Sequence, residues 1–258
     1  MDSGWELAVL LVAAFGAGLV DAVAGGGGLI QVPALFSALP LEAPATVFGT
    51  NKGSSVFGTA YAAWRYARRV DLPWRIALPA AAAALMCSFV GAATVAWLPK
   101  DVVRPVILLL LVAVAVYTAL HRDFGIASAN VPQRGILSVL AVGAVLGFYD
   151  GFFGPGMGSF LIFAFVRWFG LDFLRASAAA KIVNGSTNLA ALAYFVPTGH
   201  VLWGIALSMA LFNIGGALVG ARLAIRRGST FVRGFFLLAT MLLIVKFGHD
   251  TIATMVKL

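Results

Sequence analysis

The sequence predicts an all-α integral membrane protein made of two inverted-topology repeats, each with about five segments. Three observations lead to this prediction: an apolar composition, an internal repeat, and a reversal of basic charge between equivalent connections. Of the 258 residues, 61% are hydrophobic and 11% are charged, and the mean hydropathy is +0.98. A soluble domain carries about 25% charged residues. The composition therefore excludes a soluble fold and a disordered chain.

The apolar stretches divide into eight that can cross a bilayer and two that cannot. A spanning helix needs about 20 residues for a hydrocarbon core of about 30 Å. The two short stretches, 29–39 and 159–169, would form helices of only about 16 Å, so eight full-length helices and two half-helices are expected. The long stretches are 6–24, 44–64, 74–97, 102–120, 135–153, 174–196, 202–224 and 230–249.

The first long stretch follows acidic residues, Asp2 and Glu6, where a signal peptide would carry basic ones. Its apolar run leads into Asp21 and four glycines, with no small-residue cleavage site after it. We therefore expect it to be the first membrane segment.

Residues 1–129 and 130–258 are predicted to be an N-terminal and a C-terminal membrane repeat. A shift of 129, half of 258, places Asp21 on Asp150 and Lys52 on Lys181. Aspartate and lysine are scarce in apolar segments, so their alignment carries more weight than that of common glycines. The same shift pairs Gly18 with Gly147, Gly25 with Gly154, Gly27 with Gly156, and Gly91 with Gly220.

The basic residues predict opposite orientations for the two repeats. Residues 65–75 contain four arginines, whereas the equivalent connection near 197–201 contains no lysine or arginine. After the fourth segment the bias reverses, and the second half has the larger number of basic residues, with four arginines in residues 222–233. By the positive-inside rule, both termini should lie outside and the 121–134 connection inside. The net charge of +8 then follows from topology and requires no nucleic-acid partner.

Glycine-rich breaks precede both short segments. The first is Gly25-Gly26-Gly27-Gly28 and the second is Gly154-Pro155-Gly156-Met157-Gly158. A half-helix that begins inside the membrane presents free N–H groups and a positive dipole end, which suit an anion. Such discontinuous helices are typical of secondary transporters, and we expect the two ends, near Leu29 and Ser159, to meet. Alternatively, the glycines only allow helices to pack closely.

Four charged residues lie inside predicted membrane segments. A charge at the bilayer centre costs about 2.5–3.5 kcal/mol, and each lysine lies about 14 Å along its helix, near the midplane. One hypothesis is that Lys52 and Lys181 each neutralise the aspartate of their own repeat, Asp21 and Asp150. The alternative is that the lysines contribute to one central anion site and the aspartates act as coupling groups or counter-ions.

Hydroxyl and amide side chains surround both lysines and suit an oxyanion. No metal-ligand spacing or Ser-His-Asp arrangement is visible, and the single Cys87 excludes an internal disulfide. We therefore expect no catalytic residue, metal or cofactor. The predicted substrate-binding residues are Gly25, Gly26, Gly27, Gly28, Asn51, Lys52, Ser55, Gly154, Gly156, Gly158, Ser159, Lys181, Asn184 and Asn188.

Several of these stretches resemble the paired signatures of the sulfite exporter TauE/SafE family, within the toluene sulfonate uptake permease superfamily. They are Gly18-Leu-Val-Asp21, Gly28-Leu-Ile-Gln-Val-Pro33, Gly147-Phe-Tyr-Asp-Gly-Phe-Phe-Gly-Pro-Gly-Met-Gly-Ser-Phe160, Asn51-Lys52 and Lys181-Ile-Val-Asn184. The similarity runs along the full chain, and the second-half signature is the most specific. The resemblance implies a multi-pass permease of the bacterial inner membrane, associated with sulfite, sulfonates and related compounds.

Together, the residues and the resemblance predict one transport domain, and no enzyme. It would carry a small sulfur-containing anion, such as sulfite or an organosulfonate, by alternating access. The alternative is a membrane-embedded enzyme or redox partner that acts on sulfur compounds. The expected partners are the anionic substrate and the lipid bilayer. The sequence leaves open a homo-oligomer, the direction of transport and the coupling ion.

Overall fold

The computed structural model describes residues 4–97 and 135–255, and this part of the chain is helical, without strands. The expected all-α class is thus confirmed. The expected segment 102–120 and the 121–134 connection lie outside the described residues. The helices are α1 (Gly4–Ala24), α2 (Gly28–Ala38), α3 (Pro44–Ala67), α4 (Trp74–Trp97), α6 (Ile136–Phe152), α7 (Met157–Phe169), α8 (Phe173–Phe195) and α9 (Trp203–Met255).

In the described part of the chain, three helices are long and apolar enough to cross a membrane by themselves: α1, α4 and the 203–235 part of α9. Helices α3 and α8 are as long, with 24 and 23 residues, but they are less apolar. Their polar residues gather around Lys52 and Lys181 and are buried inside the protein. These two helices therefore contribute polar residues to the interior, whereas the apolar helices are exposed on the outside over much of their length.

Two interruptions divide the helical chain where the glycine-rich motifs predict them. Residues 25–27 separate α1 from α2, and residues 153–156 separate α6 from α7. Gly25, Gly154 and Gly156 have φ values of 77°, 95° and 83°. Only glycine adopts this left-handed conformation without strain. The helices that follow contain 11 and 13 residues, which matches the two short segments of the sequence.

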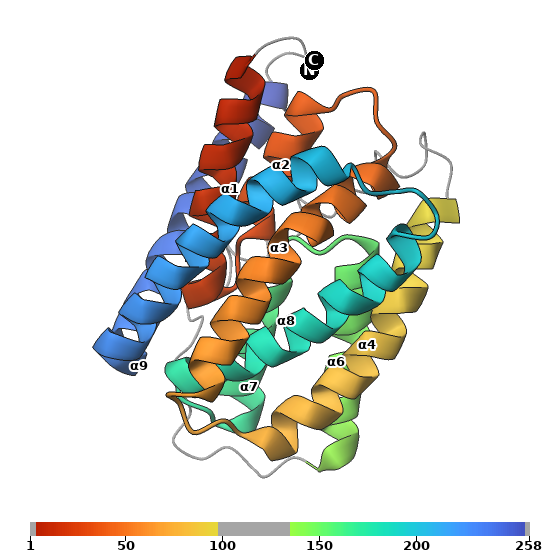
Figure 1. Ribbon diagram of the computed structural model, residues 1–258. Helices are drawn as coiled ribbons and strands as arrows, with labels where there is room; N and C mark the ends of the chain where they lie inside the picture. The colour runs from red at the N-terminus through yellow and green to blue at the C-terminus, as the bar shows by residue number, and fades with distance from the viewer. Residues whose placement is uncertain (1–3, 98–134, 256–258) are drawn as a thin grey trace.

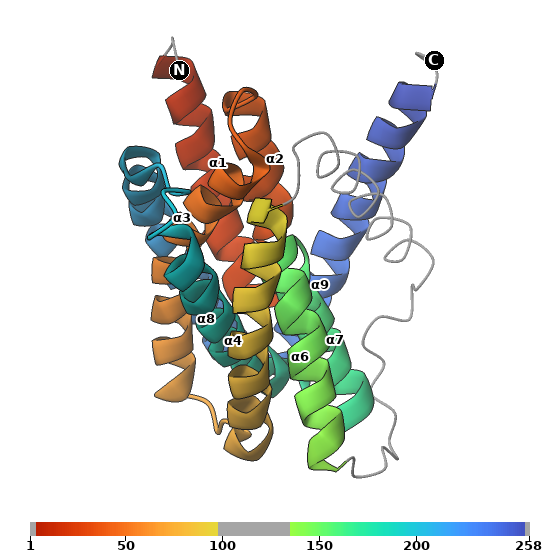
Figure 2. The same cartoon turned by 90° about the vertical axis from the view of Figure 1, so that its right-hand side faces the viewer.

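The two interruptions form hairpins that open at opposite ends of the molecule. The start of α1 and the end of α2 lie at one end, and the start of α6 and the end of α7 lie at the other (Figure 1). Helix α9 turns at Gly228, where φ is 71° and ψ is −167°. Its last part then runs back to the end at which α1 begins (Figure 2).

Helix packing follows the internal repeat. The most extensive contacts are those of α1 with α9 and of α4 with α6. A shift of 129 residues maps α1 onto α6 and α4 onto the first part of α9, so the two pairs of helices are equivalent. A Cβ on Gly18 would lie 2.1 Å from the carbonyl oxygen of Asn213, and one on Gly147 would lie 2.4 Å from the Cα of Ala84. Positions 84 and 213 are also 129 apart. These glycines therefore permit close helix approach.

Candidate functional site

The two helix breaks contact each other. A Cβ on Gly25 would lie 2.3 Å from the carbonyl carbon of Gly158, so the two backbones are in direct contact. At the other end of the junction, a Cβ on Gly28 would lie 3.2 Å from the Cα of Pro155. The Ser159 N–H donates to the Gly25 carbonyl at 3.2 Å. The breaks thus meet as the sequence predicts, but this N–H is already bonded to protein.

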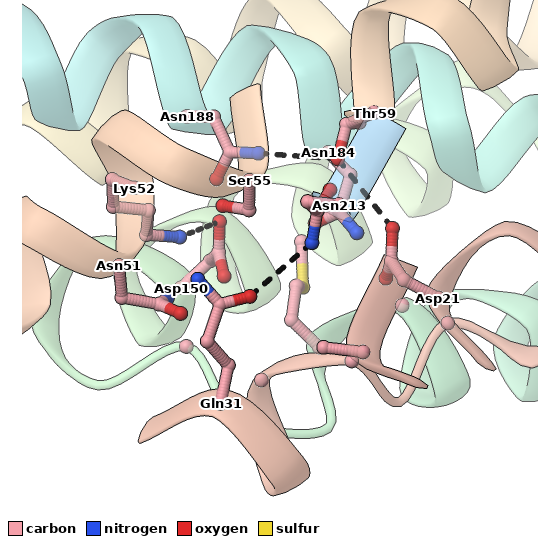
Figure 3. Close-up of a pocket in the computed structure, with 17 residues that line it drawn as sticks. Asp21, Gln31, Asn51, Lys52, Ser55, Thr59, Asp150, Asn184, Asn188 and Asn213 are labelled. Carbon is pink, nitrogen blue, oxygen red and sulfur yellow. Dashed lines mark hydrogen bonds and ion pairs between the residues drawn. The ribbon is translucent and has the colours of Figure 1, made fainter. Parts of the chain in front are cut away.

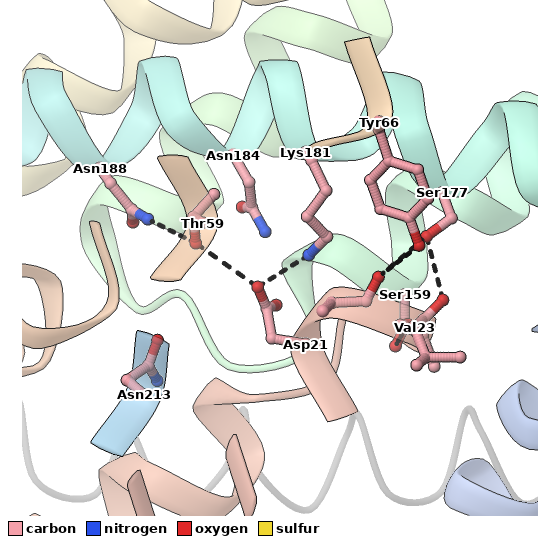
Figure 4. Close-up of polar contacts among 12 residues, drawn as sticks. Asp21, Val23, Thr59, Tyr66, Ser159, Ser177, Lys181, Asn184, Asn188 and Asn213 are labelled. Atoms are coloured by element: carbon pink, nitrogen blue, oxygen red, sulfur yellow. Dashed lines mark hydrogen bonds and ion pairs between the residues drawn. The ribbon is translucent and has the colours of Figure 1, made fainter. Parts of the chain in front are cut away.

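The C-terminal end of α1 is held by side chains from three other helices (Figure 4). Tyr66 Oη donates to the Ala22 carbonyl at 2.8 Å, Ser177 Oγ to the Val23 carbonyl at 3.0 Å, and Ser159 Oγ to the Ala24 carbonyl at 2.8 Å. The last carbonyls of a helix lack partners in their own helix. Away from water they need other donors, and these three hydroxyls supply them.

A small polar cavity lies beside the junction of the two breaks (Figure 3). The cavity has a volume of about 40 Å³, roughly three times what one water molecule requires. The cavity is lined by residues of α1, α2, α3, α8 and α9, and by residues in and next to the α6–α7 break. The predicted site residues that line it are Asp21, Gly25, Gly27, Gly28, Asn51, Lys52, Ser55, Asp150, Gly154, Gly158, Asn184 and Asn188.

Two buried ion pairs connect the two halves of the sequence. Lys52 Nζ lies 2.6 Å from Asp150 Oδ2, and Lys181 Nζ lies 2.8 Å from Asp21 Oδ2. The hypothesis that each lysine neutralises the aspartate of its own repeat is therefore wrong. Lys52 on α3 reaches the break of the other half, where a Cβ on Gly154 would lie 3.4 Å from its ammonium nitrogen. The breaks meet at the centre, so each lysine has the opposite half's aspartate within reach.

The two lysines differ in their access to the cavity. Lys181 is completely buried behind Asp21 and does not line the cavity, whereas Lys52 does. Asp21 also accepts a hydrogen bond from Thr59 Oγ1 at 3.4 Å, and Thr59 accepts one from Asn188 Nδ2 at 3.5 Å (Figure 4). Lys181 is therefore placed as a counter-ion of Asp21, and Lys52 is the lysine that a ligand in the cavity would meet.

Three more predicted residues lie outside the cavity lining: Gly26, Gly156 and Ser159. Gly156 provides the left-handed turn before α7. Ser159 joins the breaks through its hydroxyl and its N–H. A substrate-binding role for the lining residues stays a prediction.

The sequence interpretation missed five lining residues: Ala17, Gln31, Thr59, Met157 and Asn213. Asn213 Nδ2 donates to Gln31 Oε1 and to the Ala14 carbonyl, both at 3.2 Å. Gln31 and Asn213 are single amides in apolar segments. Polar residues within membrane segments are functional candidates by default, and that rule would have identified both.

Two polar atoms in the lining lack a hydrogen-bond partner among the described residues: Gln31 Nε2 and Asn51 Oδ1. Both side chains are buried, at 1% and 7% exposure. An unsatisfied buried polar atom costs about 1–3 kcal/mol, so a ligand or water in the cavity would stabilise both. In the part of the chain that the structure describes, no cluster of three or more His, Cys, Asp or Glu residues could hold a metal ion.

Comparisons with known proteins agree with this architecture. Residues 10–247 match the family model described as sulfite exporter TauE/SafE. The chain is 36% identical to "Probable membrane transporter protein ORF9" of Sinorhizobium sp, over 95% of this chain and 93% of that protein. It is 32% identical to "Probable membrane transporter protein YfcA" of Escherichia coli strain K12, over 97% and 93% of the two chains.

A "Probable membrane transporter protein" of Haemophilus influenzae is also 32% identical, over 97% of this chain and 98% of that protein. No solved structure matches the chain. The family model covers nearly the whole sequence, including both helix breaks, both lysines and both aspartates. The chain is a membrane protein and belongs to the sulfite exporter TauE/SafE family.

Proposed function

We propose that this protein is a multi-pass secondary transporter of the bacterial inner membrane. It carries a small sulfur-containing anion, such as sulfite or an organosulfonate, by alternating access. The observation that carries this proposal is the central cavity, where two helix breaks meet beside a lysine, unsatisfied amides and two ion pairs. The relatives' printed names support membrane transport, and the family description supports sulfite.

The proposed architecture is a pair of inverted repeats, residues 1–129 and 130–258. Three facts support it: the hairpins open at opposite ends (Figures 1 and 2), the helix contacts are exchanged by the shift of 129 residues, and both ion pairs obey the same shift. The α3–α4 and α7–α8 connections lie at one end of the molecule (Figure 2). Arg68 and Arg69 of the α3–α4 connection and Arg175 in the first turn of α8 lie at this end, so by the positive-inside rule this end faces the cytoplasm.

The position of the cavity between the two halves supports the proposal of alternating access. Each ion pair has one member from each half, so any relative movement of the halves changes the environment of both pairs. Secondary transporters with inverted repeats place their substrate at such an interface and move one repeat against the other. We propose that Gln31, Asn51, Lys52 and Ser55 provide donors to the anion in the central position.

Uptake into liposomes tests the proposed function. Purified protein should carry radiolabelled sulfite or methanesulfonate into vesicles, and the label should be recovered chemically unchanged. Lys52→Met should reduce this uptake at least tenfold, because a charge-assisted hydrogen bond contributes about 1.5–3 kcal/mol. Ser208→Ala, which alters an exposed hydroxyl of α9 bonded within its own helix, is the matched control. Recovery of a chemically altered compound would instead support the enzyme alternative.

A further inference from the structure

The ionisable groups around the cavity sum to zero charge. Asp21 and Asp150 contribute two negative charges, and Lys52 and Lys181 contribute two positive ones. Among the described residues no other charged side chain lines the cavity. A bound anion would therefore add an uncompensated negative charge to a buried site, and such a charge costs several kcal/mol. One proton taken up with each monovalent anion removes this cost.

The two aspartates differ in the number of their partners, and this difference indicates which of them takes up the proton. Asp21 has an aligned hydrogen bond from Lys181 and a second one from Thr59. Asp150 Oδ2 has one partner among the described residues, the Lys52 ammonium nitrogen at 2.6 Å. If Lys52 turns to another anion, Asp150 loses the cation that stabilises its charged form, whereas Asp21 keeps both of its partners.

Donors for an anion are grouped on the Lys52 side of the cavity. Figure 3 shows that the Gln31, Asn51, Ser55 and Lys52 side chains point toward the same space as Asp150. Gln31 Nε2 is a buried donor with no hydrogen-bond partner among the described residues. The Asn51 amide can present its NH₂ group after a flip, since N and O positions in such amides are assigned from the hydrogen-bond network. These groups and the three N–H bonds of the Lys52 ammonium match the oxygens of a sulfur oxyanion.

On the basis of the proposed function, we propose that a monovalent oxyanion binds Lys52 in place of the Asp150 carboxylate, and that Asp150 takes up one proton. The proton comes from water and forms an O–H bond on Asp150, while Lys52 remains an ammonium. The anion keeps its charge, so the occupied cavity is neutral, as is the empty one. A divalent anion would leave one negative charge uncompensated, and the site therefore selects monovalent anions.

Among the described residues, Lys52 is the only cation that contacts Asp150. Helix α4 packs along α6 and has one charged residue, Arg75 in its first turn, together with a half-buried Cys87. Tyr149 lies beside Asp150 on α6, and its hydroxyl donates to the Pro155 carbonyl at 2.5 Å. Helix α7 carries Arg167 in its last turn, and Lys181 of α8 is bonded to Asp21.

Proton uptake on anion binding tests this proposal directly. Detergent-purified protein in weak buffer, with a pH indicator, is titrated with sulfite at mildly acidic pH and with methanesulfonate. The wild type should take up one proton per bound anion, and its affinity should fall about tenfold per pH unit as the pH rises, by linkage. Asp150→Asn should bind the anion without proton uptake and without this pH dependence. Ser208→Ala should behave as the wild type.

Proton uptake and liposome uptake can fail independently, so proton exchange and the proposed transport function are tested separately. If the wild type binds either anion without proton uptake, the proton exchange is overturned while transport stands. If neither anion binds and neither enters liposomes, both fail. If Asp21→Asn abolishes proton uptake and Asp150→Asn preserves it, the assignment to Asp150 is overturned. Should Asp150→Asn misfold because Lys52 is left unpaired, the double variant Asp21→Asn with Lys181→Met keeps the Lys52–Asp150 pair and must still take up one proton per bound anion; loss of proton uptake with anion binding retained would overturn the assignment to Asp150.

Discussion

The two helix breaks share one backbone design but are held by different chemistry. At the end of α1, hydroxyls of Tyr66, Ser159 and Ser177 cap successive carbonyls. The shift of 129 residues places Phe195, Ile30 and Phe48 at the equivalent positions.

At the second break, Phe48 and Phe195 belong to a buried apolar cluster with Phe153. Phe48 meets Phe153 edge to face, with ring centroids 6.0 Å apart.

The two breaks therefore have the same backbone turns but different side-chain support. The first break is fixed by directional hydrogen bonds, and its aspartate has two partners. The second break is fixed by aromatic packing and by one hydroxyl, that of Tyr149, which donates to the Pro155 carbonyl. Among the described residues its aspartate, Asp150, has a single cation as partner. Hydrogen-bonded ends resist local rearrangement, whereas a lone ion pair can be replaced by a competing anion. We therefore propose that the first break, with Asp21, is the anchor and that the second break, with Asp150, is the responsive region, which changes when a ligand binds.

The largest effect should come from breaking the ion pair of the anchor. Lys181→Met leaves Asp21 buried without its cation, and breaking a buried pair costs about 3–5 kcal/mol. Adding Asp21→Asn should restore most of the lost stability, as measured by thermal unfolding in detergent. The matched control is Lys181→Met with Asp150→Asn, which pairs the lysine with the aspartate of its own half. Rescue by the control combination alone would contradict the pairing across the halves.

The contact between the breaks gives the next largest effect. Gly25→Ala should destabilise the protein by about 1–3 kcal/mol through its clash with the Gly158 backbone, and by about 1–2 kcal/mol more because φ is 77°. Gly154→Ala carries the same kind of backbone strain, with φ of 95°, but should cost less, since its Cβ would lie 3.2–3.4 Å from atoms of Asp150 and Lys52 and not 2.3 Å from a backbone carbon. Gly26→Ala is the control, because its nearest neighbours lie 3.6 Å away. Equal losses for Gly25→Ala and Gly26→Ala would disprove the close contact.

Removing one hydroxyl from the anchor tests its hydrogen-bonded character. Tyr66→Phe leaves the Ala22 carbonyl short of its closest donor and should cost about 1–3 kcal/mol of stability. Tyr61→Phe, on the same helix but only half-buried and packed on Trp64, should change stability by less than about 0.5 kcal/mol. Denaturant titration of both variants distinguishes these results. A neutral Tyr66→Phe would mean that this hydroxyl does not hold the first break.

The smallest effect concerns a single donor in the responsive region. Gln31→Leu removes the unpaired amide donor that points into the cavity and should weaken anion binding about threefold to tenfold, as expected for one hydrogen bond. Stability should fall little, because the variant also removes an unsatisfied buried group. The measurement is isothermal titration with methanesulfonate, with Ser208→Ala as reference. Unchanged affinity would place the anion away from α2.

Much of the fold could be predicted from the sequence because local signals specify it. Apolar run lengths located the described helices within a few residues, and the glycine motifs located both interruptions. The short helices begin at Gly28 and Met157, close to the expected 29 and 159. The partners of the lysines could not be predicted, because they depend on how the two halves interlock and not on spacing along the chain.

The candidate site was predicted in part for the same reason. Rare charges and the glycines beside them are visible in any apolar sequence, and Asp21, Lys52 and Asp150 do line the cavity. Ser159 and Lys181 carry the expected polar groups, but tertiary contacts bind those groups to other protein atoms. Asn213 lies far along the chain in an apolar helix, and only the fold brings it to Gln31.

We propose that one anion-binding cavity lies between two halves that move relative to each other. Cysteine labelling at Ser55 is the most direct test of this proposal. Ser55 lines the cavity, and Cys87→Ser removes the single native thiol. In oriented vesicles, Ser55→Cys should react with an impermeant thiol reagent added from either side, and methanesulfonate should protect it from both. Reaction from one side only, unchanged by the anion, would contradict alternating access at this cavity.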